Sequence, residues 1–115
     1  MKIEFVGDKA RMASEKHFNG AFTPDEMIDL VKTIVKNKTH LGLSDRGNNG
    51  HPPALIIWGD YAGVTFQITV DSQHIKRGLM TIVAFYDVSG KSKEFKRQRF
   101  NMQPVKKGDN NGLER

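Results

Sequence analysis

Residues 71–78 (DSQHIKRG) bring a histidine and two cations together in one short polar segment. His74 precedes Lys76 by two residues and Arg77 by three. Histidine titrates near neutral pH, so it can act as an acid or a base. Lys and Arg stabilise the negative charge that builds up on a reacting phosphate. These residue types suit phosphodiester cleavage without a metal, with His74 as the acid/base group. The alternative is an ordinary polar turn.

Two further polar residues, Thr81 and Tyr86, lie inside the apolar run 79–87. Polar groups in such a run need hydrogen-bond partners if they are buried. Each could orient a phosphate, Thr81 in catalysis and Tyr86 in substrate binding. The alternative for both residues is a structural role.

A second basic cluster lies at 93–102, which we expect to form a strand. Arg97 and Arg99 would then share one face with Phe95, and Lys96 would lie beside them. Guanidinium groups and an aromatic ring on one sheet face suit phosphate contacts and base stacking. The alternative is a charged edge strand that prevents aggregation.

The four histidines do not have metal-ligand spacing. His51 lies in the Gly- and Asn-rich loop 41–53, where it is either a substrate contact that could serve as a second acid/base group or an ordinary loop residue. His17 and His40 are expected to be solvated near helix ends. The chain has no cysteine and no phosphate-binding GxxxxGK[ST] motif, so we expect no metal and no cofactor.

Charge is segregated along the 115-residue chain. Residues 71–107 contain nine Lys or Arg and three acids, a net charge of +6. The net charge of the whole chain is +5, so the other residues together carry −1. A one-sided positive field attracts nucleic acid, an anionic membrane or an acidic protein. The alternative is a surface that serves solubility alone.

Two helices are expected in the N-terminal part, at 8–18 and 24–37. The second begins with a capping signal, because Thr23 suits the N-cap, Pro24 the first helical position and Glu26 the capping box. Apolar residues behind this signal repeat at helical spacing.

The rest of the chain predicts strands. They lie at 54–58, 64–70, 79–87 and 93–102; the first two form a hairpin, and the third is central because both its faces are apolar. The fold class is therefore α+β, with two N-terminal helices on one face of a roughly four-stranded antiparallel sheet. The other face would be open to a ligand. We expect a single domain over 1–115, with a helical part at 8–37, the sheet at 54–103 and a frayed tail at 104–115.

No apolar stretch approaches the ~20 residues of a membrane span, and the N-terminus does not resemble a signal peptide. We expect a soluble, cytoplasmic protein, or one exported as part of a longer chain.

The order of two helices and four antiparallel strands, in a basic domain without cysteine, resembles the barnase-, EndoU-, colicin- and RelE-like ribonuclease fold. This fold supplies the C-terminal toxins of bacterial contact-dependent growth inhibition proteins and colicins. The resemblance covers roughly residues 8–103. It implies a site of scattered His, Lys, Arg and Thr side chains on the sheet, here His74, Lys76, Arg77, Thr81, Arg97 and Arg99.

The expected function is that of a metal-independent endoribonuclease toxin. It would cleave structured RNA, such as transfer RNA, by attack of a 2′-hydroxyl on the phosphate, inside a target cell. The resemblance also implies an acidic cognate immunity protein as partner. One alternative is a non-catalytic nucleic-acid-binding or inhibitor domain that uses the same face. Another is a module that binds an anionic membrane or an acidic protein.

Overall fold

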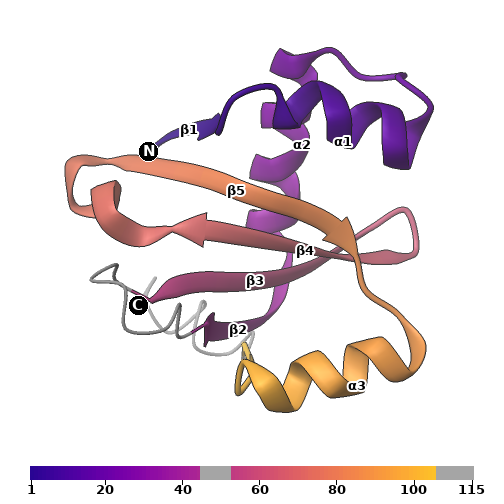
Figure 1. Cartoon of the computed structure of the whole chain (residues 1–115), viewed down its shortest axis with the longest axis vertical. Coiled ribbons are helices and arrows are strands. Elements are labelled where there is room, and N and C mark those ends of the chain that lie inside the picture. The colour runs from indigo at the N-terminus through magenta and orange to yellow at the C-terminus, as the bar shows by residue number, and fades with distance from the viewer. Residues whose placement is uncertain (45–52, 106–115) are drawn as a thin grey trace, which may run out of the picture.

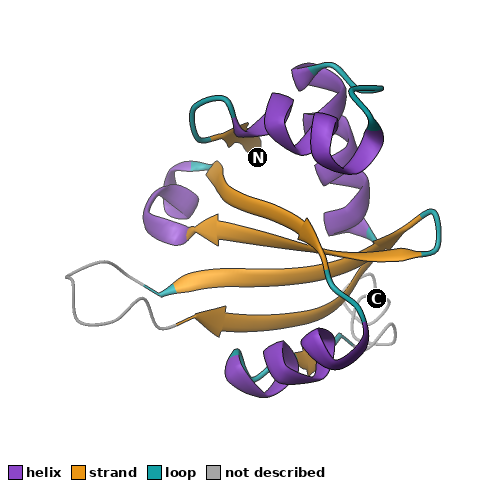
Figure 2. Ribbon diagram, turned by 45° about the vertical axis from the view of Figure 1, so that its right-hand side comes forward, coloured by secondary structure: helices purple, strands orange, loops and turns teal. Residues whose placement is uncertain are grey.

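A computed structural model describes residues 1–44 and 53–105. They form a six-stranded sheet with two helices on one face and a third on the other (Figures 1 and 2). The elements are β1 (Lys2–Phe5), α1 (Lys9–Phe18), α2 (Pro24–Lys36), β2 (Lys38–Ser44), β3 (Ala54–Tyr61), β4 (Val64–Asp71), the 3₁₀ helix η1 (Ser72–Arg77), β5 (Leu79–Asp87), α3 (Gly90–Arg99) and β6 (Gln103–Pro104). The α+β class is confirmed. None of the helices in these two ranges is long and apolar enough to cross a membrane.

The sheet has the strand order β1-β5-β4-β3-β2-β6. Strands β2 to β5 form an antiparallel meander, in which each strand pairs with the next along the chain. At the two edges, β1 pairs with β5 in parallel and β6 pairs with β2. The expected four-stranded, purely antiparallel sheet is therefore wrong in strand number and at one edge.

The hairpin of β3 and β4 confirms the prediction from alternation. Phe66, Ile68 and Val70 are buried on the face that α1 and α2 cover. Ala62 and Gly63 make the turn with φ of 52° and 80°. Two consecutive left-handed residues match the right-handed twist of the strands that they join.

The capping signal before α2 is also confirmed. Glu26 N donates to Thr23 Oγ1 at 3.2 Å, and Thr23 N donates to Glu26 Oε1 at 2.9 Å. Behind this cap, Met27, Val31 and Ile34 are fully buried against the sheet. They pack closely because β3 carries Gly59 at the crossing, where an added Cβ would overlap the Ile34 carbonyl oxygen.

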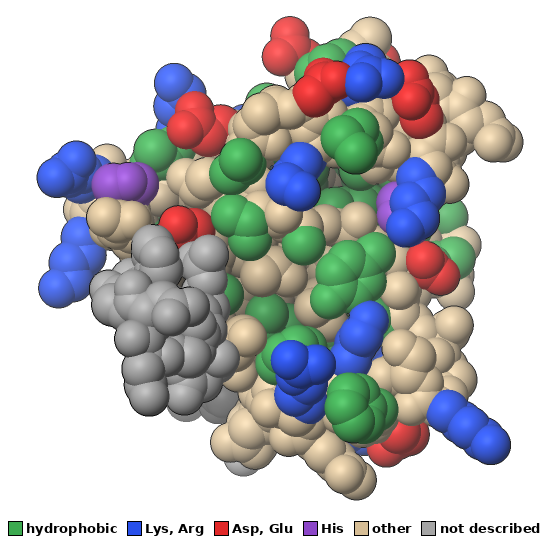
Figure 3. Space-filling model, in the orientation of Figure 1, with side chains coloured by type: hydrophobic (Ala, Val, Ile, Leu, Met, Phe, Trp, Pro, Cys, Tyr) green, Lys and Arg blue, Asp and Glu red, His purple; other side chains and the backbone are tan. Residues whose placement is uncertain are grey.

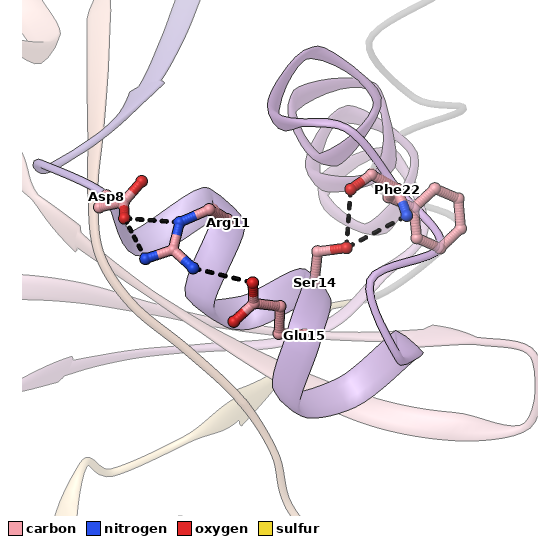
Figure 4. A network of polar contacts seen from close by, with 5 residues as sticks. All are labelled: Asp8, Arg11, Ser14, Glu15 and Phe22. Carbon is pink, nitrogen blue, oxygen red and sulfur yellow. Dashed lines mark hydrogen bonds and ion pairs between the residues drawn. The ribbon is translucent and has the colours of Figure 1, made fainter.

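Helix α1 is tied to the start of α2 by a buried serine (Figure 4). Ser14 Oγ donates to the Phe22 carbonyl at 2.7 Å and accepts from Phe22 N at 3.1 Å. On the exposed side, Arg11 binds both Asp8 and Glu15. The serine bonds fix α1 to the segment before α2, and Figure 1 shows α1 above β5.

The segment expected as a fourth strand is a helix. Residues 90–99 form α3, and Lys93 N donates to the Ser89 carbonyl at its start. Its Lys, Glu, Gln and Arg residues are good helix formers. In a helix, Arg99 follows Phe95 by one turn whereas Arg97 does not, so the predicted common face of all three is wrong. Phe100 and Met102 then pack on the sheet, so the second face is partly covered rather than open.

Other boundaries also differ from prediction. Residues 41–44, expected as a loop, belong to β2, and β1 was missed. Strand β1 depends on β5, a partner distant in sequence, whereas β2 pairs with β3, the next strand along the chain. The 71–78 segment is not an open turn but η1, with Asp71 at its N-cap and Gly78 at φ 81°. His51, most of the predicted loop and the tail beyond Val105 lie outside the described residues.

Candidate nucleic-acid interface

Helix α3 concentrates positive charge on the second face of the sheet. It carries five cations and one acid, namely Lys91, Lys93, Lys96, Arg97, Arg99 and Glu94. Glu94 forms an ion pair with Arg97 at 3.5 Å. The helix presents no buried residue of its own and is held by its flanks, Val88 before it and Phe100 and Met102 after it. Lys91, Phe95 and Arg99 are exposed, whereas Lys93, Lys96 and Arg97 are partly buried.

A chain of buried polar groups crosses the strands on the face that α3 covers. Trp58 Nε1 donates to Gln67 Oε1 at 2.9 Å, and Gln67 Nε2 donates to Tyr86 Oη at 2.5 Å. Trp58 and Gln67 are fully buried, and the three residues lie opposite one another on β3, β4 and β5. Burial raises the pKa of Tyr86, so its hydroxyl stays neutral. The position of the half-buried Tyr86 ring is fixed by this chain.

Two lysines of α3 lie against these aromatic rings. Lys96 Nζ is 4.1 Å from the centroid of the Tyr86 ring, and Lys93 Nζ is 5.6 Å from that of Trp58. Lys93 Nζ also donates to Thr65 Oγ1 at 3.2 Å. Cations within about 6 Å of a ring are attracted by its electron-rich face. Burial lowers the pKa of Lys96. The sequence named Lys96 and Tyr86 separately, and the fold brings them together.

The arginines of α3 lie near β2. Arg97 Nε is buried and has no hydrogen-bond partner among the described residues. Burial lowers the pKa of His40 on β2, and Arg97 and Lys93 lower it further. Arg99 lines a shallow hollow of about 380 Å³ with Leu43 and other residues of β2 and β3. Positive charge therefore extends along α3 from the end of β5 toward β2.

One aromatic side chain of α3 is exposed. Phe95 has 63% of its surface accessible and lies among charged neighbours. Single-stranded nucleic acids are bound by basic surfaces that also offer aromatic rings for base stacking. Phe95 supplies such a ring beside the cations.

The structure does not bring the His74 cluster to this surface. The 3₁₀ helix η1 precedes β5 and α3 follows it, so His74 and Tyr86 are separated by most of β5, which spans about 26 Å. Thr81 belongs with η1, because its partner on β4 is Asp71, the N-cap of η1. His74 is partly buried, whereas Lys76 and Arg77 are exposed. The sequence thus named two groups at opposite ends of β5.

The prediction that His17 and His40 are solvated is wrong. The His17 side chain is 8% exposed, surrounded by Phe18, Phe66 and Phe85, and its Nδ1 lies 3.7 Å from Asp87 Oδ1. His40 is partly buried against Trp58, with ring centroids 5.3 Å apart. The position of His17 was detectable, because it continues the helical spacing of the buried residues Ala10, Ala13 and Ser14.

In the described part of the chain, no three His, Asp or Glu residues are grouped to hold a metal ion.

Comparison of the chain with protein-family models, curated proteins and solved structures gives no match. The function must therefore be argued from the site itself.

The Gln67 amide should be essential to the stability of this face. Gln67→Leu leaves the buried Trp58 N–H without its partner and removes one of the partners of the Tyr86 hydroxyl, which keeps its bond to Thr69. We expect a loss of about 2 kcal/mol in unfolding free energy by urea denaturation. The exposed Gln73→Leu is the matched control and should change stability by less than about 0.5 kcal/mol. Equal stability of the two variants would contradict a stabilising role for the hydrogen bonds that join Trp58, Gln67 and Tyr86.

His40 should make stability depend on pH. Its folded pKa lies below the ordinary value of about 6.5, so the unfolded chain binds the proton more tightly. This contribution to stability is fully present above that value and is lost as the pH falls below it. Comparing urea midpoints at pH values of about 7.5 and 5.5 should show a smaller acid-induced decrease in His40→Gln than in the wild type. If the urea midpoint of His40→Gln decreases as much as that of the wild type, the loss of stability in acid is due to other groups.

Proposed function

We propose that the protein binds RNA through the α3 face, defined as Lys91, Lys93, Lys96, Arg97 and Arg99 with Phe95 and Tyr86. The observation that supports this most is the concentration of five cations and one acid on a single helix beside a fixed Tyr86 ring. Phosphates would contact the cations, and unpaired bases would stack on Phe95.

An anionic membrane is a weaker candidate for this surface. A helix that lies in a membrane interface needs a continuous exposed apolar face. On α3, Phe95 is the one large hydrophobic side chain that is exposed. The pattern of charge therefore favours nucleic acid, a polyanion with aromatic bases, and is less suited to a lipid surface.

Neutralising the exposed end residues of α3 tests the binding proposal. Lys91→Gln/Arg99→Gln should weaken the affinity for a fluorescein-labelled RNA hairpin about tenfold, measured by anisotropy. The slope of log K against log salt should also decrease by about 0.7 for each lost contact with unpaired RNA.

The matched control is Lys32→Gln/Lys36→Gln on the exposed face of α2, which removes the same charge elsewhere. It should retain affinity within about twofold. If both double variants weaken equally, net charge rather than the α3 face is responsible.

A metal-independent endoribonuclease is the second candidate, and η1 is the observation that favours it. Asp71 Oδ1 accepts from Gln73 N at 3.0 Å, and Gly78 N donates to the carbonyls of His74 and Ile75. In a 3₁₀ helix residues three apart lie on the same side, so Arg77 shares a side with His74. Thr81 pairs with Asp71, the N-cap of the same helix.

In that reaction His74 accepts the proton of a ribose 2′-hydroxyl, and the 2′-oxygen forms a bond to phosphorus. The bond from phosphorus to the 5′-oxygen breaks, and this oxygen takes a proton from an acid. Lys76 and Arg77 would stabilise the charge on the phosphate oxygens. His51 remains a candidate for the second acid/base group.

Incubation with total bacterial RNA in EDTA tests this activity. We expect discrete fragments on a gel from the wild-type chain and none from His74→Ala, with RNA affinity kept within a few-fold. Gln73→Ala on the same helix is the control and should still cleave. Intact RNA with every variant would leave binding at the α3 face as the function and return His74 to a structural position.

The toxin role and its acidic immunity protein are also part of the proposal. Their support is the resemblance together with the charge of the α3 face. An inhibitor that covers this face would exclude RNA by occupying the same cations.

A further inference from the structure

Strand β5 has a free edge along half of its length. On the side away from β4, β1 pairs with Leu79 to Ile82, and its last bond is from Val6 N to the Ile82 carbonyl at 2.9 Å. The chain then turns away at Gly7, which has φ of 54°. No strand of the described residues pairs on that side with the segment from Val83 to Asp87.

The pairing with β4 determines which backbone groups face this edge. Val88 N donates to the Thr65 carbonyl at 2.9 Å. Because antiparallel partners alternate, Ala84 and Tyr86 direct their backbone groups toward β4, whereas Phe85 and Asp87 direct theirs away from it. The edge thus offers the N–H and C=O groups of Phe85 and Asp87.

A groove of about 610 Å³ lies between this edge and α1. It is lined mainly by Lys9, Met12, Ala13 and Lys16 of α1 and by Ala84 and Tyr86 of β5. Met12 is 56% exposed within it. Figure 3 shows hydrophobic side chains at the surface between the region of α1 above and that of α3 below, bordered by Lys and Arg on both sides.

Two lysines line the α1 wall of the groove, and Asp87 adds one carboxylate at the end of the β5 edge. Neither Lys9 nor Lys16 forms an ion pair with the described residues, whereas Glu15, the acid in its lining, is bound by Arg11 (Figure 4). The two lysines therefore leave an excess of positive charge along one wall. Charged side chains near an edge strand can also serve only to prevent aggregation. That role would require neither a groove of this size nor an exposed Met12.

We propose that the free edge of β5 binds an extended, acidic segment of a partner protein as an added strand. The segment would lie in line with β1 and exchange main-chain hydrogen bonds with Phe85 and Asp87. On the side of α1, its acidic side chains would meet Lys9 and Lys16. Its apolar side chains, which alternate to the other side of the strand, would face Tyr86. This surface shares Tyr86 with the α3 face but none of its cations, so the inference does not depend on RNA binding.

The probe is a fluorescein-labelled peptide of alternating acidic and apolar residues, Asp-Val-Glu-Ile-Asp-Val-Glu, with blocked ends. We expect saturable binding, measured by anisotropy, with a dissociation constant below ~1 mM. In hydrogen exchange followed by NMR, the peptide should slow exchange of the Phe85 and Asp87 amides. The same peptide with Lys in place of each acid should bind about tenfold more weakly.

Charge reversal locates the site. Lys9→Glu/Lys16→Glu should weaken peptide binding about tenfold or more, whereas Lys32→Glu/Lys36→Glu on α2 should keep it within about twofold. Native-like far-UV circular dichroism of both double variants would establish that they fold.

Three outcomes would overturn the proposal: no binding at the highest peptide concentration, binding without protection of Phe85 and Asp87, or equal weakening by both charge reversals. Protection of the same two amides by a labelled RNA hairpin, with no effect of the peptide, would assign the groove to RNA instead. Each of these outcomes is distinguishable from failure of the α3 variants to affect RNA affinity.

Discussion

The α3 face depends on one buried amide. Gln67 is fully buried between Trp58 and Tyr86, accepting from the first and donating to the second. A buried amide is costly unless its groups are paired, so the three strands must keep the register that supplies both partners. That register places the Tyr86 ring where Lys96 of α3 can lie over it. The same amide therefore links sheet pairing to the position of the basic helix.

The two faces of the sheet are used differently because their contacts differ. On one face, α2 packs directly over Gly59 and buries a continuous apolar surface. On the other face, α3 buries none of its own residues and is anchored by Val88, Phe100 and Met102 around it. Helix α1 covers the first face only as far as the edge of β5. The first face thus supplies most of the core, while α3 and the β5 edge are left available for ligands.

Local signals explain which elements could be predicted from the sequence. The hairpin of β3 and β4 and the capping box at Thr23 involve residues close in the chain, so their patterns were sufficient. Strand β1 is defined by a partner distant in sequence, and the signal for β2 was hidden because residues 41–44 run into a segment rich in Gly, Asn and Pro. Helix α3 has one large apolar residue, Phe95, so no apolar periodicity distinguishes it from a charged edge strand. These choices are decided by tertiary packing, which a single sequence does not display.

The candidate site was predictable as residue types but not as an arrangement. Lys96, Tyr86, Arg97 and Arg99 were all named, yet their meeting depends on α3 being a helix that crosses the second face. His74 was grouped with them because the sequence gives no distance across β5. In the structure, η1 and the Lys96–Tyr86 pair lie at opposite ends of that strand, so cleavage and binding become separate hypotheses.

Photo-crosslinking tests the central claim most directly. An RNA hairpin with 4-thiouridine in its loop would be crosslinked to the wild-type chain, and the modified residues identified by mass spectrometry. If RNA binds the α3 face, crosslinks will be found at Phe95, Tyr86 and neighbouring residues of α3. Crosslinks confined to α2 or to η1, with none on α3, would contradict it.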